Sequence, residues 1–422
     1  MSTTFRARLR GGSRLAVGSR LALVCGIAIA VAAPAIASGS QAAGGQDAVG
    51  AVYTQTNSPA GNAVVVFDRA SDGTLTKRES VSTGGTGSTQ SVGCGPGCPI
   101  LDSQTAVVVS KNGKFVFAVN AGSDTVTSFR ETKDGLVRVD QVSSGGDMPE
   151  SLALHGDLLY VLNVATGGRG NIYGLRISPD GGLSPIGSSR PLADPAPPDH
   201  SADPRAIDFN SKGTVLVVTE IAGGFMGPGG PPGRIVTFVV GNDGKAGPAA
   251  SHPSNGGFPF GFAFDNKDHL IVTNIEDPSG MSIGSVSSYT VSDSGDVTPI
   301  NKVSSGGVLP CWVVVTNDGR TAYVVNTGAG LPAPVTFYDV SSKGVLSSGG
   351  APAASSPGEF ARTDAALSRD DKYLYVLSPS VGPGAPSHID EYRLANDGSM
   401  TLIGSTPAGA DLGVGATGLA AR

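Results

Sequence analysis

The sequence is poor in charged and aromatic residues, which make up 15% and 6% of its 422 residues. It contains 62 Gly and 29 Pro, which cost roughly 1 and 3 kcal/mol at a helix interior position, so a helical bundle or a coiled coil is excluded. The hydrophobic share of 39% is large enough for a globular core and argues against general disorder. Short runs rich in Val, Thr and Tyr favour strands. The composition therefore predicts a large all-β protein with many turns.

The most apolar stretch, Leu21–Ala33, has 13 residues, fewer than the roughly 20 that a membrane-spanning helix needs. Before it come no acidic residue and five arginines: Arg6, Arg8, Arg10, Arg14 and Arg20. After it come the small residues Ala35-Ile36-Ala37, which are typical of a signal-peptide cleavage site. We predict a cleaved signal peptide over residues 1–37, a flexible linker over 38–50, and a mature protein secreted or held outside the cytoplasm without stable membrane insertion. The alternative is an uncleaved membrane anchor.

Clusters of basic residues are also missing. Removal of residues 1–37 takes away five of the 29 basic residues and no acidic one, which leaves 24 basic residues against 35 acidic ones. Nucleic-acid binding needs a basic surface, and anionic membranes repel an acidic protein. We therefore expect no nucleic-acid partner, and a monomer that binds a small molecule.

Cysteine is rare, with four residues in the whole chain. Cys94 and Cys98 enclose a tight Gly-Pro-Gly turn, and in an oxidising compartment this spacing favours a small disulfide loop. A zinc site would need two further ligands, and no histidine is close in sequence, so we predict neither a metal nor a cofactor. Cys311 lies in the apolar run Leu309–Val315, where a buried thiol is expected.

One unit recurs along the chain. Its clearest part is an alternating apolar strand that ends in a polar residue, present as Phe115–Asn120, Leu158–Asn163, Val215–Glu220, Leu270–Asn274, Ala322–Asn326 and Tyr373–Ser378. The ends of consecutive copies are 43 to 57 residues apart, and Val52–Asn57 begins the series. Seven copies of about 50 residues are typical of propeller blades.

Each copy also contains a strand before this one and two strands after it, joined by Asx-Gly turns such as Asn112-Gly113 and Asp243-Gly244. The unit is a four-stranded antiparallel meander. The chain begins on a second strand, Ala51–Asn57, and ends on Ala416–Ala421, the missing first strand. We predict a seven-bladed β-propeller over residues 51–422, closed by pairing of the C-terminal strand with the N-terminal blade. An open solenoid would instead leave exposed strand edges.

Two stretches of the repeat, Leu309–Arg320 and Leu367–Leu377, resemble the lactonase family of seven-bladed propellers. This family includes 6-phosphogluconolactonase and carboxymuconate cyclase. The resemblance extends over nearly the whole predicted mature chain. It implies the propeller fold and suggests chemistry on a lactone, a small cyclic ester.

In a propeller, the start of each first strand and the end of each second strand open on one face around the central channel, where ligands usually bind. This placement predicts a rim formed by Glu150, Asn163, Arg205, Glu220, Asn274, Asn326, Arg362, Asp364 and Ser378. Trp312 starts another first strand, where it either lines the channel or packs in the core.

Arg205 and Glu220 are expected to face each other across adjacent antiparallel strands. An arginine can stabilise the charge that develops on an ester oxygen, while a carboxylate deprotonates water. The resemblance supports these roles, because the family's proposed catalytic set resembles Pro204-Arg205 and Glu220. The alternative is a structural ion pair.

Two positions depart from the family pattern: Glu150 follows Pro149 where relatives have His, and Ile275 follows Asn274 where relatives often have Arg. These departures favour a second hypothesis, a non-catalytic exported propeller that binds a small ligand or a protein on the same face. The sequence contains no nucleophile elbow, Walker loop, Rossmann fingerprint or EF-hand loop.

Overall fold

The computed structural model divides the chain into two units, residues 1–44 and 45–422. It describes residues 48–89, 101, 103–164, 170–192, 203–221, 233–276, 283–328, 333–353, 362–379, 387–409, 412 and 416–422. The predicted signal peptide, most of the predicted linker and the predicted Cys94–Cys98 disulfide lie outside these residues. The described residues contain no helix long and apolar enough to cross a membrane.

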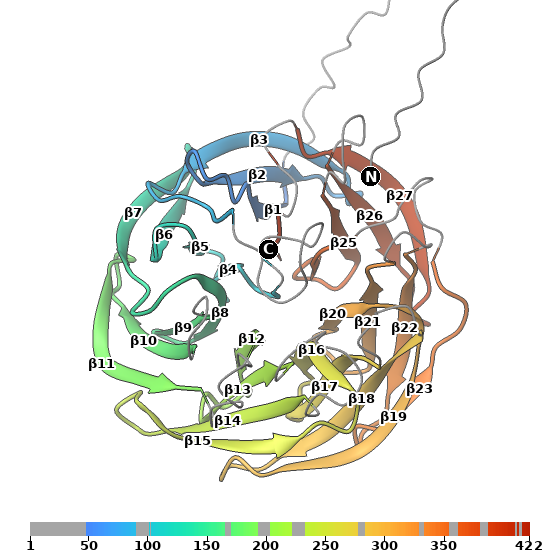
Figure 1. Cartoon of the computed structure of the whole chain (residues 1–422). Coiled ribbons are helices and arrows are strands. Elements are labelled where there is room, and N and C mark those ends of the chain that lie inside the picture. The colour runs from blue at the N-terminus through green and yellow to red at the C-terminus, as the bar shows by residue number, and fades with distance from the viewer. Residues whose placement is uncertain are drawn as a thin grey trace, which may run out of the picture. The chain divides into compact units, whose positions relative to one another are not determined.

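The second unit consists of seven four-stranded antiparallel sheets arranged in a ring (Figure 1). Blade 1 contains β28 (Leu419–Ala421), β1 (Gly50–Gln55), β2 (Ala63–Arg69) and β3 (Leu75–Ser82). Blade 2 contains β4 (Val107–Val109), β5 (Phe115–Asn120), β6 (Thr125–Thr132) and β7 (Gly135–Ser143). Blade 3 contains β8 (Pro149–His155), β9 (Leu158–Asn163), β10 (Asn171–Ile177) and β11 (Leu183–Pro191).

The other four blades repeat this order from the innermost strand outward. Blade 4 contains β12 (Pro204–Phe209), β13 (Val215–Glu220), β14 (Arg234–Val240) and β15 (Ala246–Pro253). Blade 5 contains β16 (Phe258–Phe264), β17 (His269–Ile275), β18 (Ile283–Val291) and β19 (Val297–Val308). Blade 6 contains β20 (Pro310–Val315), β21 (Thr321–Asn326), β22 (Val335–Val340) and β23 (Leu346–Ser348). Blade 7 contains β24 (Ala365–Leu367), β25 (Tyr373–Ser378), β26 (His388–Leu394) and β27 (Met400–Pro407).

The predicted all-β fold is therefore confirmed, and so is its closure. β28 pairs with β1 in antiparallel register, with Tyr53 opposite Ala420. Both chain ends thus contribute to blade 1, so no blade is left with an unpaired second strand.

The hydrophobic core lies between neighbouring blades rather than inside one. Alternating side chains of each strand point to the two faces of its sheet, and each face packs on the next blade. For example, Phe117 and Val119 of blade 2 pack with Leu159 and Val161 of blade 3 in one buried cluster. Each blade is therefore held by both of its neighbours.

Candidate functional site

The first strands of four blades begin with the same backbone irregularity. A proline pairs with the last or next-to-last residue of the second strand, and the register then shifts: Pro149 opposite Asn163, Pro204 opposite Glu220, Pro259 opposite Asn274 and Pro310 opposite Asn326. Such a β-bulge re-aims the residue that follows the proline. Glu150 and Arg205 occupy this position in blades 3 and 4.

The residue before the proline has a positive φ in three of these blades: 56° at Met148, 48° at Asp203 and 51° at Leu309. Its carbonyl accepts a hydrogen bond from the residue that follows the second strand; Asp203, for example, accepts from Ile221 at 3.0 Å. Left-handed backbone is uncommon for residues other than glycine and is often found at functional sites. The rim of the channel is thus built from a constrained backbone.

Arg205 is fully buried at the start of β12. Its Nη2 donates to Asp203 Oδ1 at 2.7 Å, and its guanidinium lies over the Phe260 ring of the next blade, 5.2 Å from the ring centre. The sequence pattern predicted that Arg205 would lie opposite Glu220. The bulge displaces the register by one residue, so that Pro204 takes this position.

Glu220 is the last residue of β13 and is 1% exposed. Four other blades carry asparagine at the equivalent position: Asn120, Asn163, Asn274 and Asn326. Each of these side-chain amides donates a hydrogen bond of 2.9 to 3.0 Å to a neighbouring strand or linker. The acceptors are Thr127 Oγ1 for Asn120, the Ser144 carbonyl for Asn163, Ser287 Oγ for Asn274 and the Pro334 carbonyl for Asn326. Asn120, Asn274 and Asn326 therefore join parts of their own blades, and Asn163 joins blade 3 to the linker before it, whereas blade 4 places a carboxylate at this position.

A short segment before β4 lies across the centre of the ring. The Gln104 side-chain amide donates to the Phe262 carbonyl at 3.1 Å and to the Val313 carbonyl at 3.0 Å, in blades 5 and 6. Ser103 Oγ donates to the Glu150 carbonyl at 2.6 Å, and the Gln104 N–H donates to the Arg205 carbonyl at 3.4 Å. Residues 103–104, which we call the channel plug, thus connect the bulges of blades 3 and 4 to the opposite side of the ring.

Trp312 belongs to the core rather than to an open channel wall. It is fully buried, meets the Phe260 ring edge-on at 5.7 Å, and donates its indole N–H to the Ser103 carbonyl at 3.3 Å. Cys311, the residue before it, is buried, as predicted.

Blade 7 contains a second buried arginine. Arg362 Nη2 donates to Asp390 Oδ2 and to the Tyr392 hydroxyl, both at 2.9 Å. Asp364 is also buried, and its carboxylate accepts the backbone N–H groups of Ala365 at 2.8 Å and Leu419 at 2.9 Å. Burial raises the pKa of Asp364 to about 7. Its contacts tie blade 7 to the closing strand β28.

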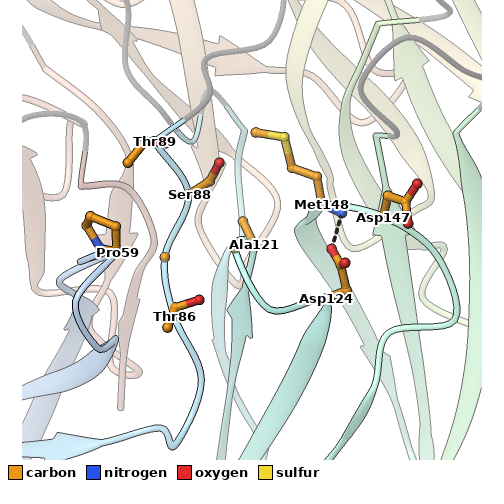
Figure 2. Close-up of a pocket in the computed structure, with 10 residues that line it drawn as sticks. Pro59, Thr86, Ser88, Thr89, Ala121, Asp124, Asp147 and Met148 are labelled. Carbon is orange, nitrogen blue, oxygen red and sulfur yellow. Dashed lines mark hydrogen bonds between the residues drawn. The ribbon is translucent and has the colours of Figure 1, made fainter.

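A cavity of about 430 Å³ opens on the same face, between the loops of blades 1, 2 and 3 (Figure 2). The described residues that line it are Pro59, Thr86, Gly87, Ser88, Thr89, Ala121, Gly122, Asp124, Asp147 and Met148. Asp124 Oδ1 accepts the Met148 N–H at 2.7 Å, and Figure 2 shows the Met148 side chain extending toward Ser88.

Sequence reasoning missed Asp203, Asp390 and the channel plug. Asp203 directly precedes Pro204-Arg205, so the Asp-Pro-Arg sequence was the available signal. The Gln104 side chain contacts strands 158 and 209 positions away, and no local sequence pattern indicates such a contact. No group of three described His, Cys, Asp or Glu residues is placed to hold a metal ion.

Comparisons with known proteins agree with this architecture. Residues 60–184 match a family model described as lactonase, 7-bladed beta-propeller. The structure of a putative 6-phosphogluconolactonase from Bacteroides uniformis superposes with a TM-score of 0.64 and 16% identity, over 88% of this chain and 99% of that one. The periplasmic gluconolactonase of Pseudomonas aeruginosa gives a TM-score of 0.64 and 16% identity, over 88% of this chain and 98% of that one. A search of curated proteins gives no match. The resemblance to the lactonase propellers is confirmed.

Proposed function

We propose that this propeller of the lactonase type hydrolyses small lactones at the rim around Arg205 and Glu220. The observation that carries the proposal is the exception in the repeat: blade 4 has a buried carboxylate where four other blades have a structural asparagine. The same blade has a buried arginine at its bulge. A carboxylate costs free energy to bury, so its presence at this position calls for a role other than blade packing.

In the proposed reaction, Glu220 takes a proton from a water molecule, and the resulting hydroxide adds to the lactone carbonyl carbon. Arg205 stabilises the negative charge on the carbonyl oxygen. The intermediate collapses with cleavage of the ring C–O bond, and the ring oxygen takes the proton from Glu220. One water is consumed, and the product is a hydroxy acid.

Asp203 has a supporting role in this scheme. Its carboxylate holds one end of the guanidinium at 2.7 Å, and the Phe260 ring lies beside the guanidinium. These contacts fix the orientation of Arg205 before substrate arrives, which reduces the cost of ordering the site.

The competing hypothesis is an exported propeller that binds a ligand without catalysis. It is favoured by the Arg205–Asp203 ion pair, because a paired arginine stabilises new negative charge less strongly. Glu150 and Ile275, which depart from the family pattern, favour it as well.

A panel of lactones assayed by pH-stat separates these hypotheses. Glu220→Gln is expected to lower kcat about 100-fold to 10,000-fold, the usual effect of losing a general base, and Arg205→Ala to lower it about 100-fold. Glu276→Gln, which removes a carboxylate just after β17, is the matched control and should retain activity. Unchanged hydrolysis in Glu220→Gln would contradict the mechanism. If the wild type hydrolyses no lactone but binds one, the binding hypothesis is supported.

We also propose that the protein is exported as a monomer with a mature N-terminus near Ser38 and a Cys94–Cys98 disulfide. The arginine-rich start, the apolar run and the Ala35-Ile36-Ala37 sequence support export. Intact mass of the secreted protein, before and after thiol labelling, is the test. An intact N-terminus contradicts cleavage, and labelling of three cysteines in unreduced, denatured protein contradicts the disulfide.

A further inference from the structure

Two adjoining cavities lie at the end of the channel opposite to the rim. The first strands of the blades surround the centre of the ring (Figure 1), and the turn that follows each first strand lies on this opposite face. The cavities have volumes of about 690 and 520 Å³ and are lined by the ends of first strands and by these turns. The residues that line both of them are Val109, Ser110, Lys111 and Arg369. We call the two together the lower cavity.

Much of the wall of the lower cavity is apolar. Five blades contribute an aliphatic side chain from the last or next-to-last residue of the first strand: Ala421, Val109, Leu154, Val315 and Leu367. All five, which we call the apolar collar, are partly exposed. Covering aliphatic surface is worth roughly 25 cal/mol per Å². The apolar collar therefore favours a ligand with an apolar body.

Two exposed basic side chains border this wall. Lys111 lies in the turn after β4 and Arg369 in the turn after β24. Within the described part of the chain neither forms an ion pair, whereas Arg422, which also lines the lower cavity, is held by Glu131 at 3.2 Å. An ammonium or guanidinium without a partner can bind a carboxylate. In a chain of net charge −6, two such cations at one cavity favour an anion.

The two acids in the described lining reduce this positive charge only in part. Asp371 accepts the Asn317 N–H at 2.8 Å and its side-chain amide at 2.9 Å. Asp208 accepts the Phe209 N–H at 2.8 Å, and burial raises the pKa of Asp208 to about 7. At pH 6 this carboxyl is mostly protonated and can donate a hydrogen bond to an anion. His155, which also lines the cavity, adds positive charge when it is protonated.

The channel plug lies between the lower cavity and the rim. Thr105 directly follows the plug and lines the lower cavity, and its hydroxyl donates to the Gln104 carbonyl at 2.7 Å. The Gln104 side chain in turn donates to carbonyls of blades 5 and 6. A ligand in the lower cavity is thus on the other side of the plug from Arg205 and Glu220.

We infer that the lower cavity is a second ligand site, which binds a small organic anion with an apolar body, such as a medium-chain carboxylate. The apolar part of the ligand lies against the apolar collar, and Lys111 and Arg369 bind its anionic group. This inference goes beyond the proposed hydrolysis and does not rest on it, because it concerns another face of the ring and is tested without turnover.

The test is a ligand-observed NMR titration of the full chain at pH 6 with octanoate, 1-octanol and acetate. Octanoate carries both an apolar chain and a charge, 1-octanol only the chain, and acetate only the charge. A unit charge about 4 Å from another in water changes affinity roughly five-fold, and two cations are present, so octanoate should bind at least about ten-fold more tightly than 1-octanol. Acetate should bind more weakly than octanoate by a larger factor.

Three outcomes of this titration overturn the inference. Equal affinities for octanoate and 1-octanol would show that the site does not recognise an anion. Equal affinities for octanoate and acetate would show that the apolar collar does not contribute. No binding of octanoate would show that the cavity is not a site for this class of ligand.

Substitutions place the bound ligand. Lys111→Met and Arg369→Met should each weaken octanoate binding about five-fold and leave 1-octanol binding unchanged. Lys343→Met removes an exposed charge between the outer strands β22 and β23 and is the matched control, with unchanged affinity expected. Val109→Thr replaces a methyl group of the apolar collar by a hydroxyl and should weaken binding of both ligands about four-fold.

The same variants can contradict the placement. Unchanged octanoate affinity in both Lys111→Met and Arg369→Met overturns the assignment to the lower cavity. Weaker octanoate binding in Glu220→Gln also overturns it, because that side chain lies on the other side of the channel plug. A failure of the proposed lactone hydrolysis would leave all of these binding results in force.

Discussion

At the scale of single residues, two buried carboxyl groups make the stability of the ring depend on pH. Burial raises the pKa of Asp208 and of Asp364 to about 7, from an ordinary value of 3.8. The folded state binds these protons more tightly than the unfolded chain does. Protonation therefore contributes most to stability below about pH 4, and this contribution is lost as the pH rises through about 7. The rise in pH lowers the free energy of unfolding by up to about 4 kcal/mol for each such group. The loss is smaller for Asp208, because this side chain is partly exposed.

We therefore predict that the free energy of unfolding of the wild type falls between pH 4.5 and pH 8. Asp208 accepts one backbone hydrogen bond, from Phe209, and lines a cavity at the other end of the first strands. Asp208→Asn should leave stability at pH 4.5 nearly unchanged and raise it at pH 8 by about 1 to 3 kcal/mol. Urea denaturation at the two pH values is the measurement, and equal slopes with pH in wild type and variant would contradict the prediction.

Glycine gives a second prediction at this scale. A Cβ on Gly307 would lie 2.6 Å from Asn326 Cγ, so this asparagine, which donates to the Pro334 carbonyl, has no room for a larger neighbour. Gly307→Ala should destabilise the protein by about 1 to 3 kcal/mol, as overpacking does. Gly247→Ala is the control, because its Cβ would meet only the Val239 carbonyl, at 3.2 Å. Thermal denaturation compares them, and equal melting temperatures would show that the asparagine can move aside.

At the scale of elements, the sequence pattern predicted individual strands better than their alignment. The predicted strands Phe115–Asn120 and Val215–Glu220 coincide with β5 and β13, because alternation and Asx-Gly turns are local signals. The backbone register differs by one residue from the expected pairing of Arg205 with Glu220, because Pro204 lies opposite Glu220. Its cause is a bulge, whose register depends on backbone geometry and not on residue type alone. The place of Asp364 at the ligand face stays a prediction, and the structure adds hydrogen bonds that join blade 7 to β28 through its carboxylate.

The channel plug gives the prediction at this scale. The Gln104 amide donates to two carbonyls in different blades, and a carboxylate cannot donate. Gln104→Glu should lower the free energy of unfolding by roughly 2 to 4 kcal/mol, because both carbonyls then face a buried negative charge. Gln141→Glu, on the outer strand β7, is the control, with an expected loss below about 1 kcal/mol. A similar loss in free energy of unfolding in both variants would mean that the channel plug contributes little to the stability of the ring.

At the scale of the whole molecule, the ring is closed by only three residues of β28. Deletion of residues 419–422 exposes the inner edge of β1, and it should destabilise every blade together, since each is held by its neighbours. Deletion of Arg422 alone removes hydrogen bonds to Tyr53 and Glu131 and should cost about 1 to 2 kcal/mol. Calorimetry distinguishes the two deletions. The longer deletion is expected to give a single unfolding transition at a much lower temperature, and an unchanged transition temperature would contradict closure by β28.

The channel plug also determines how solutes move through the molecule. Residues 103–104 hydrogen-bond to blades 3, 4, 5 and 6 across the centre of the ring, so they stand in the way of a solute that would pass straight through it. If the proposed hydrolysis takes place at Arg205, the hydroxy acid leaves on the side of the plug from which the lactone entered. Product and substrate then share one passage, so we expect turnover to fall as the product accumulates.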